Sequence, residues 1–98
     1  MMEETGMKAQ VIEEIRALAG EYGVEKVILF GSRARGNYKR ASDIDLAVSG
    51  GDILRFALAV DEETSTPLRF DIINLDGMVC EELQKAIWTE GKILYEKI

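Results

Sequence analysis

The sequence predicts a small α/β (or α+β) protein in which helices pack on one short β-sheet. Helical and extended apolar patterns alternate along the chain in the order helix, strand, loop, strand, helix, strand, helix, which is typical of this class. The chain has 98 residues, of which 47% are apolar and 31% charged, as expected for a globular protein with one core. We therefore expect a single domain over residues 1–98, with strand directions left open by the pattern.

The first half of the chain supplies a helix, a strand and an unusual loop. Apolar residues recur at helical spacing over residues 6–22, which predicts an amphipathic helix that stops at Gly23. Residues 24–30 are short and almost continuously apolar, which favours a buried strand that Gly31 ends. The loop at 31–42 is more polar and more basic than a simple connection needs.

The second half continues the alternation after that loop. Asp52 is expected to cap the middle helix, and Cys80 and Trp88 are expected to pack in the core from the last helix. The expected elements are a strand at 44–48, a helix from Asp52 to about Glu63, a strand at 68–75, a helix at about 78–88 and an extended tail at 93–95.

Composition excludes several classes of protein. The net charge of −6 argues against an extended nucleic-acid surface, which needs a basic face. No apolar run approaches the roughly 20 residues that span a membrane, and the acidic start is unlike a signal peptide, so a cytoplasmic location without membrane contact is expected. With no histidine and one cysteine, catalysis would have to use carboxylates, hydroxyls, cations or hard metal ions.

The stretch GSRARGNYKRASDIDLAV, residues 31–48, carries a cluster of positive charges followed by two negative ones. Four of the 12 basic residues of the chain lie in its first part, and its first acidic residue is Asp43. A positive loop on an acidic body suits a small anion, although a solvated basic loop is the plain alternative. That alternative is preferred for residues 38–40, which are expected to form a mobile, solvated segment.

Asp43 and Asp45 stand at positions i and i+2 at the start of the second strand. Side chains alternate along a strand, so both carboxylates would lie on one face, about 6.6 Å apart. Two like charges in this position repel unless a cation lies between them, and Mg²⁺ prefers carboxylate and phosphate oxygens. Alone, the pattern is a weak signal, because Asp43 could simply start the strand while Asp45 faces solvent.

Gly31 and Ser32 follow directly after the first strand, where the chain must turn. A glycine lets a phosphate approach the backbone closely, and Ser32 can donate both its N–H and its hydroxyl. Arg33 and Arg35 could bracket the negative charge of a triphosphate. Together with the two aspartates, these residues form one constellation.

This constellation resembles the signature of the nucleotidyltransferase superfamily typified by DNA polymerase β, in which a Gly-Ser turn precedes Asp-x-Asp by about ten residues. The Gly-Ser-x-Ala-Arg-Gly form, in a chain of this length, is similar to the minimal nucleotidyltransferases. The similarity runs from the first helix to the tail EGKILY at 90–95. It implies a polymerase β-like fold with a small mixed sheet, and an enzyme that transfers a nucleotide.

The resemblance also implies a third carboxylate on a neighbouring strand. Asp71 is the only acidic residue inside the apolar strand at 68–75, where an unpartnered carboxylate would be costly. Asp76 is the competitor, but it precedes Gly77 and is more typical of a turn or a helix cap. We therefore predict that Asp71 completes the site.

As the resemblance implies, the site would use ATP and two Mg²⁺ ions. The first two aspartates would hold one ion on the β- and γ-phosphates, and all three would share the second, with Asp71 as the base for the attacking hydroxyl. The expected catalytic and metal-binding residues are Asp43, Asp45 and Asp71, and the expected nucleotide-binding residues are Gly31, Ser32, Arg33 and Arg35.

The family also suggests a partner. Minimal nucleotidyltransferases are typically paired with a HEPN-domain ribonuclease, which implies an antitoxin that transfers AMP to a tyrosine of that toxin. A chain too short for an acceptor domain is expected to complete its site with a second protein or another copy of itself. The alternative is a non-catalytic antitoxin with a vestigial nucleotide site; transfer to a small molecule such as an aminoglycoside is disfavoured.

Overall fold

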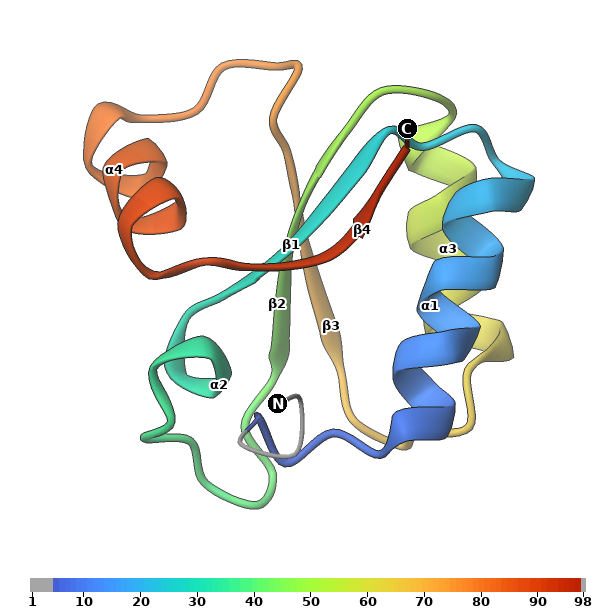
Figure 1. Cartoon of the computed structure of the whole chain (residues 1–98), viewed down its shortest axis with the longest axis horizontal. Helices are drawn as coiled ribbons and strands as arrows, with labels where there is room; N and C mark the ends of the chain where they lie inside the picture. The colour runs from blue at the N-terminus through green and yellow to red at the C-terminus, as the bar shows by residue number, and fades with distance from the viewer. Residues whose placement is uncertain (1–4, 98) are drawn as a thin grey trace.

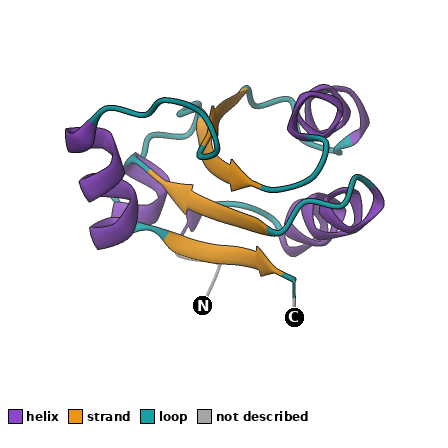
Figure 2. Ribbon diagram, turned by 90° about the horizontal axis from the view of Figure 1, so that it is seen from above, coloured by secondary structure: helices purple, strands orange, loops and turns teal. Residues whose placement is uncertain are grey.

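A computed structural model describes residues 5–97 and shows a four-stranded sheet between two groups of helices (Figures 1 and 2). The strands lie in the order β3-β2-β1-β4. The elements are α1 (Ala9–Glu21), β1 (Lys26–Phe30), α2 (Ser32–Arg35), β2 (Ile44–Ser49), α3 (Ile53–Glu63), β3 (Phe70–Asn74), α4 (Glu81–Glu90) and β4 (Lys92–Glu96).

The sheet is mixed, as the resemblance implied. β1 pairs antiparallel with both β2 and β4, whereas β2 and β3 run parallel. Parallel strands need a crossover between them, and α3 forms that crossover from β2 to β3. β2 and β3 consequently begin at the same end of the sheet, the end at which β1 finishes and leads into α2.

The larger core lies on the sheet face covered by α1 and α3, drawn at the right of Figure 1. The strands present alternate side chains to it, and the two helices also pack against each other. Its fully buried members include Ile15 of α1, Phe56 and Val60 of α3, and Val27, Leu29, Ile44, Leu46 and Val48 of the sheet.

The opposite face carries a much smaller apolar cluster under α4. The buried members of this cluster are Ile28, Phe30, Ala47 and Ile87, of which Ile87 is the single buried residue of α4. A helix that contacts a sheet through so narrow a stripe covers only part of it. The other end of this face, where β2 and β3 begin, is therefore left for polar side chains.

The helices and strands fall where the sequence predicts them, with shifted ends. α4 begins at Glu81 instead of about residue 78, because Cys80 has an extended backbone at the N-cap position. Asp52 caps α3 as expected, accepting a hydrogen bond from the Arg55 N–H at 3.2 Å. The third strand is shorter than predicted, and residues 32–35 form a short helix of their own.

The predicted core packing of Cys80 and Trp88 is wrong. Cys80 is exposed at the start of α4, and the Trp88 side chain is 63% exposed. Because α4 buries only one narrow stripe, the residue that follows Ile87 in sequence stays largely exposed. The Trp88 ring instead lies 5.5 Å from the Lys26 Nζ, in a cation–π contact.

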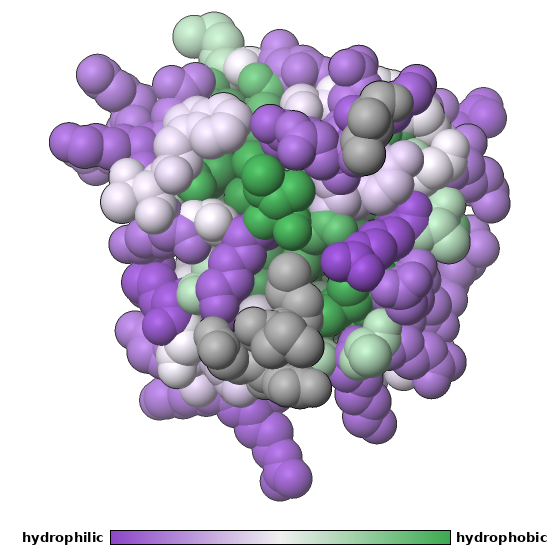
Figure 3. All heavy atoms as spheres, in the orientation of Figure 1, coloured by the Kyte–Doolittle hydropathy of each residue, from purple (hydrophilic) through white to green (hydrophobic). Residues whose placement is uncertain are grey.

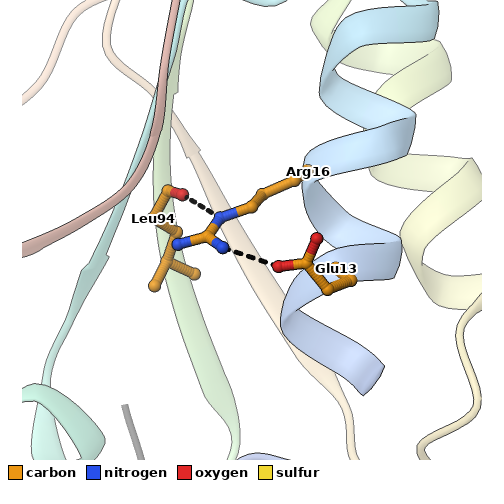
Figure 4. A network of polar contacts seen from close by, with 3 residues as sticks. All are labelled: Glu13, Arg16 and Leu94. Atoms are coloured by element: carbon orange, nitrogen blue, oxygen red, sulfur yellow. Dashed lines mark hydrogen bonds and ion pairs between the residues drawn. The ribbon is translucent and has the colours of Figure 1, made fainter. Parts of the chain in front are cut away.

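An arginine outside the motif fastens α1 to the last strand. The Arg16 Nε donates a hydrogen bond to the Leu94 carbonyl at 2.7 Å, and its Nη1 pairs with Glu13 at 2.6 Å (Figure 4). β4 is an edge strand, and its pairing with β1 changes register between Val27 and Ile28 of β1. The guanidinium therefore supplies a backbone partner at the sheet edge that no neighbouring strand provides.

Hydrophilic side chains cover most of the surface in Figure 3, around an apolar area near its centre. Within residues 5–97, no helix combines the length and the apolar character that crossing a membrane requires.

Candidate active site

The parallel pairing of β2 and β3 places two of the predicted carboxylates next to each other. Asp45 and Asp71 are direct register partners, and partners in adjacent strands project from the same face of a sheet. Asp43 directly precedes β2, two residues before Asp45. Ile44 and Leu46 are fully buried on the α1–α3 side, so the alternating aspartates belong to the side of α4.

Asp71 is exposed, rather than held in apolar surroundings as the sequence suggested. The strand is apolar in sequence because Phe70 and Ile72 pack against the larger core, whereas Asp71 projects from the opposite face. Asp76 has the turn role expected of the competitor, accepting a hydrogen bond from the Gly50 N–H at 2.8 Å.

Gly31 connects β1 to α2 directly beside Asp45. It has φ 76° and ψ −157°, a left-handed conformation that residues with a side chain rarely adopt. A Cβ at this position would overlap with the Asp45 Oδ2. Glycine is thus required twice here, once by the backbone and once by the carboxylate that lies against it.

Ser32 and Arg35 occupy the two ends of α2. Ser32 is partly exposed immediately after Gly31, and its carbonyl accepts hydrogen bonds from the Gly36 and Asn37 N–H groups. Arg35 is exposed, and its Nη1 lies 3.0 Å from the Glu90 Oε2 at the end of α4. The ion pair ties α2 to α4, and both helices lie at the left of Figure 1, on the side of the sheet opposite α1 and α3.

Electrostatics single out Asp45 among the three carboxylates. Partial burial raises its pKa above the ordinary value of 3.8, and the negative charges of Asp71 and Asp43 raise the pKa further. The Arg35 charge acts in the opposite direction but does not cancel the rise. The surroundings of Asp45 thus disfavour its ionised form, and a bound cation would relieve this.

The chemistry of these side chains fits a hard divalent cation. Every candidate donor is a carboxylate oxygen, the ligand type that Mg²⁺ prefers, and beside partial burial the charges of Asp71 and Asp43 help to raise the pKa of Asp45. Within the part of the chain that the structure describes, no three acidic, histidine or cysteine side chains form a ready-made metal cluster. Asp45 and Asp71 project from the same face of the sheet, and Asp43 lies two residues before Asp45.

Arg33 was expected to bind the triphosphate, but its side chain is buried and bonded to backbone carbonyls. Its side chain is only 2% exposed, and its guanidinium donates to the carbonyls of Thr5, Arg40 and Ser42. Tyr38, expected in a solvated segment, stacks 4.8 Å from the Arg33 Cζ. A helix of four residues has too short a repeat to show which side chain faces inward, so the sequence carried no signal for this.

Similarity to known proteins identifies the class to which this fold belongs. The profile of the family described as "Polymerase beta, Nucleotidyltransferase" matches residues 13–98. "Putative protein adenylyltransferase MJ0604" of Methanocaldococcus jannaschii is 34% identical to this chain, over 97% of the chain and 100% of that protein. The chain therefore belongs to the polymerase β nucleotidyltransferase family and is a nucleotidyltransferase enzyme.

Solved structures share the fold. The "Crystal structure of the toxin-antitoxin with AMP-PNP" superposes with a TM-score of 0.71 at 26% identity, covering 88% of this chain and 73% of that one. The "Structure of putative minimal nucleotidyltransferase" superposes with a TM-score of 0.65 at 30% identity, covering 83% of this chain and 86% of that one. The mixed sheet and its helices are thus the nucleotidyltransferase fold that the sequence signature predicted.

Proposed function

We propose that this protein is an antitoxin that transfers AMP from ATP to a tyrosine hydroxyl of a HEPN-type toxin. The carrying observation is the carboxylate face, on which Asp45 and Asp71 are register partners and Asp43 precedes Asp45 by two residues. The adenylyltransferase name of the archaeal relative supports AMP as the transferred group. The toxin–antitoxin solved with AMP-PNP supports an adenine nucleotide as substrate and a toxin as partner.

In this proposal Asp43 and Asp45 would hold one Mg²⁺ ion, and together with Asp71 they would hold a second. Bound Mg²⁺ would neutralise phosphate charge and lower the pKa of the acceptor hydroxyl. Asp71 accepts the proton of that hydroxyl, and its exposure leaves it open to an acceptor from outside the chain. The hydroxyl oxygen forms the new bond to the α-phosphorus, the bond from the α-phosphorus to the β-phosphate oxygen breaks, and pyrophosphate leaves.

The turn between β1 and α2 serves the triphosphate. Gly31 lets a phosphate lie close to the backbone, and Ser32 offers its N–H and hydroxyl beside it. Arg35 is exposed and its charge already acts on Asp45, so it is placed to offset the phosphate charge. Arg33 is left out of this set because its guanidinium is buried against backbone carbonyls.

Labelled ATP tests the assignment directly. The protein is incubated with Mg²⁺, ATP labelled in the α-phosphate, and the product of the neighbouring gene as the candidate toxin. We expect label on that partner, and a loss of at least about 100-fold in the transfer rate for Asp43→Asn, Asp45→Asn or Asp71→Asn. Asp76→Asn is the matched control, since its side chain serves a turn through the Gly50 N–H, and it should retain activity.

Two results would contradict the proposal in different ways. Full transfer by a folded Asp45→Asn variant would show that the carboxylates do not form the site. A tight complex that carries no label and is unchanged by Asp71→Ala would show that the protein masks its partner by binding alone. Measuring binding and label on the same samples separates these outcomes.

A further inference from the structure

The loop between α2 and β2 is built around one buried charge. Residues 36–43 are the polar, basic segment that leads from α2 to Asp43. The Arg33 guanidinium lies beneath them and donates four hydrogen bonds: to the Thr5 carbonyl at 2.8 Å, to the Arg40 carbonyl at 3.3 Å, and twice to the Ser42 carbonyl, at 3.1 and 3.0 Å. A buried cation is costly unless it is saturated in this way.

Further contacts close the same cluster. The Tyr38 ring lies 4.8 Å from the Arg33 Cζ, and Gly6, with φ 71°, lies so close to that ring that a side chain would overlap it. The Ser42 hydroxyl accepts a hydrogen bond from the Lys39 N–H at 2.7 Å. The loop is thus fixed from below by Arg33 and from within by Ser42.

The position of Ser42 makes this cluster relevant to the site. Ser42 directly precedes Asp43, whereas Asp43 itself precedes the first residue of β2. Asp45 and Asp71 are held by the ladder between β2 and β3. Asp43 lies between two restrained peptides: the Ile44 N–H after it donates to the Arg69 carbonyl at 2.8 Å, and the Ser42 carbonyl before it accepts the two bonds from Arg33.

We propose that Arg33 is a positioning residue that fixes Asp43 for metal binding, and that it makes no contact with the nucleotide. The inference rests on the proposed function insofar as the carboxylates hold a divalent cation. A planar guanidinium suits the task because it bridges several carbonyls in fixed directions, which a lysine ammonium cannot do. The Thr5 bond also couples the segment before α1 to the site loop.

The test compares Arg33→Met and Arg33→Lys with wild type. Mn²⁺ binding is followed by the spectroscopic signal of the ion with AMP-PNP present, and loop protection by amide hydrogen exchange of residues 36–43. We expect Arg33→Met to weaken Mn²⁺ binding by about 10-fold or more, as the loss of a group that orients a metal ligand does. Exchange in the loop should accelerate, and Arg33→Lys should recover part of both properties.

Arg16→Met is the matched control. Arg16 is also an arginine bound to a backbone carbonyl, that of Leu94, but it lies between α1 and β4 (Figure 4). We expect Arg16→Met to leave Mn²⁺ binding and exchange in the loop unchanged. If Arg33→Met does not fold, Arg33→Lys is compared with wild type instead, because lysine keeps the positive charge but lacks the planar guanidinium.

The outcomes separate the inference from the proposed function. A folded Arg33→Met that binds Mn²⁺ as wild type does would overturn the inference, as would a raised KM for ATP with Mn²⁺ binding intact, which would indicate contact with the triphosphate. A wild type that binds Mn²⁺ but transfers no AMP would contradict the proposed function and leave the role of Arg33 standing. A wild type that binds no Mn²⁺ would overturn both.

Discussion

Single residues in this site are constrained more by what they touch than by their chemical type. Position 31 requires glycine because φ is positive and the Asp45 carboxylate lies against it. The Arg33 guanidinium is held by three carbonyls and an aromatic ring. Both lie in the stretch that carries the sequence signature. Part of that signature therefore records packing around the aspartates that we propose to be catalytic.

Replacing Gly31 with alanine tests this constraint. We expect Gly31→Ala to lose about 2–3 kcal/mol of unfolding free energy and most of its transfer activity, because strained backbone and displaced Asp45 add together. Gly23→Ala is the control: Gly23 has φ 69°, but a Cβ there would meet nothing within 4 Å. It should lose only about 1 kcal/mol and keep its activity; equal losses in denaturant unfolding would show that Asp45 accommodates the methyl group.

At the scale of elements, the pairing of β2 with β3 and the placing of α2 near α4 bring the site together. The parallel register aligns Asp45 with Asp71, and the crossover through α3 makes that register geometrically accessible. The Arg35–Glu90 ion pair joins α2 to the end of α4. Its partners are 43% and 37% exposed, so it adds little to stability and instead restrains Arg35.

Glu90→Gln tests that restraint. We expect the free energy of unfolding to change by less than about 1 kcal/mol, and the KM for ATP to fall by about two- to fivefold because Arg35 is released toward the triphosphate. Steady-state kinetics and denaturant unfolding on the same protein measure both. Glu82→Gln, at the opposite end of α4, should change neither; a KM that rises in Glu90→Gln would mean that the pair orients Arg35 productively.

For the whole molecule, one face of the sheet carries the larger core and the other carries the proposed site. The face under α1 and α3 holds the larger core, whereas the α4 face has only a small cluster and carries the aspartates. The raised pKa of Asp45 means that the folded protein binds this proton more tightly than the unfolded chain does. Ionising Asp45 therefore costs stability, and this cost appears as the pH rises through the ordinary pKa of 3.8 toward the raised pKa.

Asp45→Asn should consequently stabilise the protein while it abolishes transfer. We expect a gain of up to about 1 kcal/mol in unfolding free energy at pH 7, small because solvent screens the charges. The gain should shrink as the pH falls to about 4, where the wild-type carboxyl takes up its proton. Asp76→Asn removes one negative charge from a turn and serves as control; a destabilised Asp45→Asn at pH 7 would contradict the expected sign.

The sequence by itself determined the class of fold, the order of the helices and strands, and the residues of the motif. Apolar periodicity predicted α1 and α3 because each buries one continuous stripe. The strand pattern placed Ile44 opposite Asp45 because side chains alternate. The resemblance supplied the mixed sheet and pointed to Asp71, both of which depend on strand order that local pattern does not contain.

Only the tertiary structure decided which charged residues face the site and which hold it in place. Arg33 and Arg35 are two residues apart in one basic cluster, yet Arg33 is buried under the loop and Arg35 is exposed toward Glu90. Trp88 and Ile87 are neighbours, yet only Ile87 is buried. Burial depends on which segments pack against a residue, and for Arg33 these are the loop that follows it and the segment at Thr5, 28 residues away along the chain.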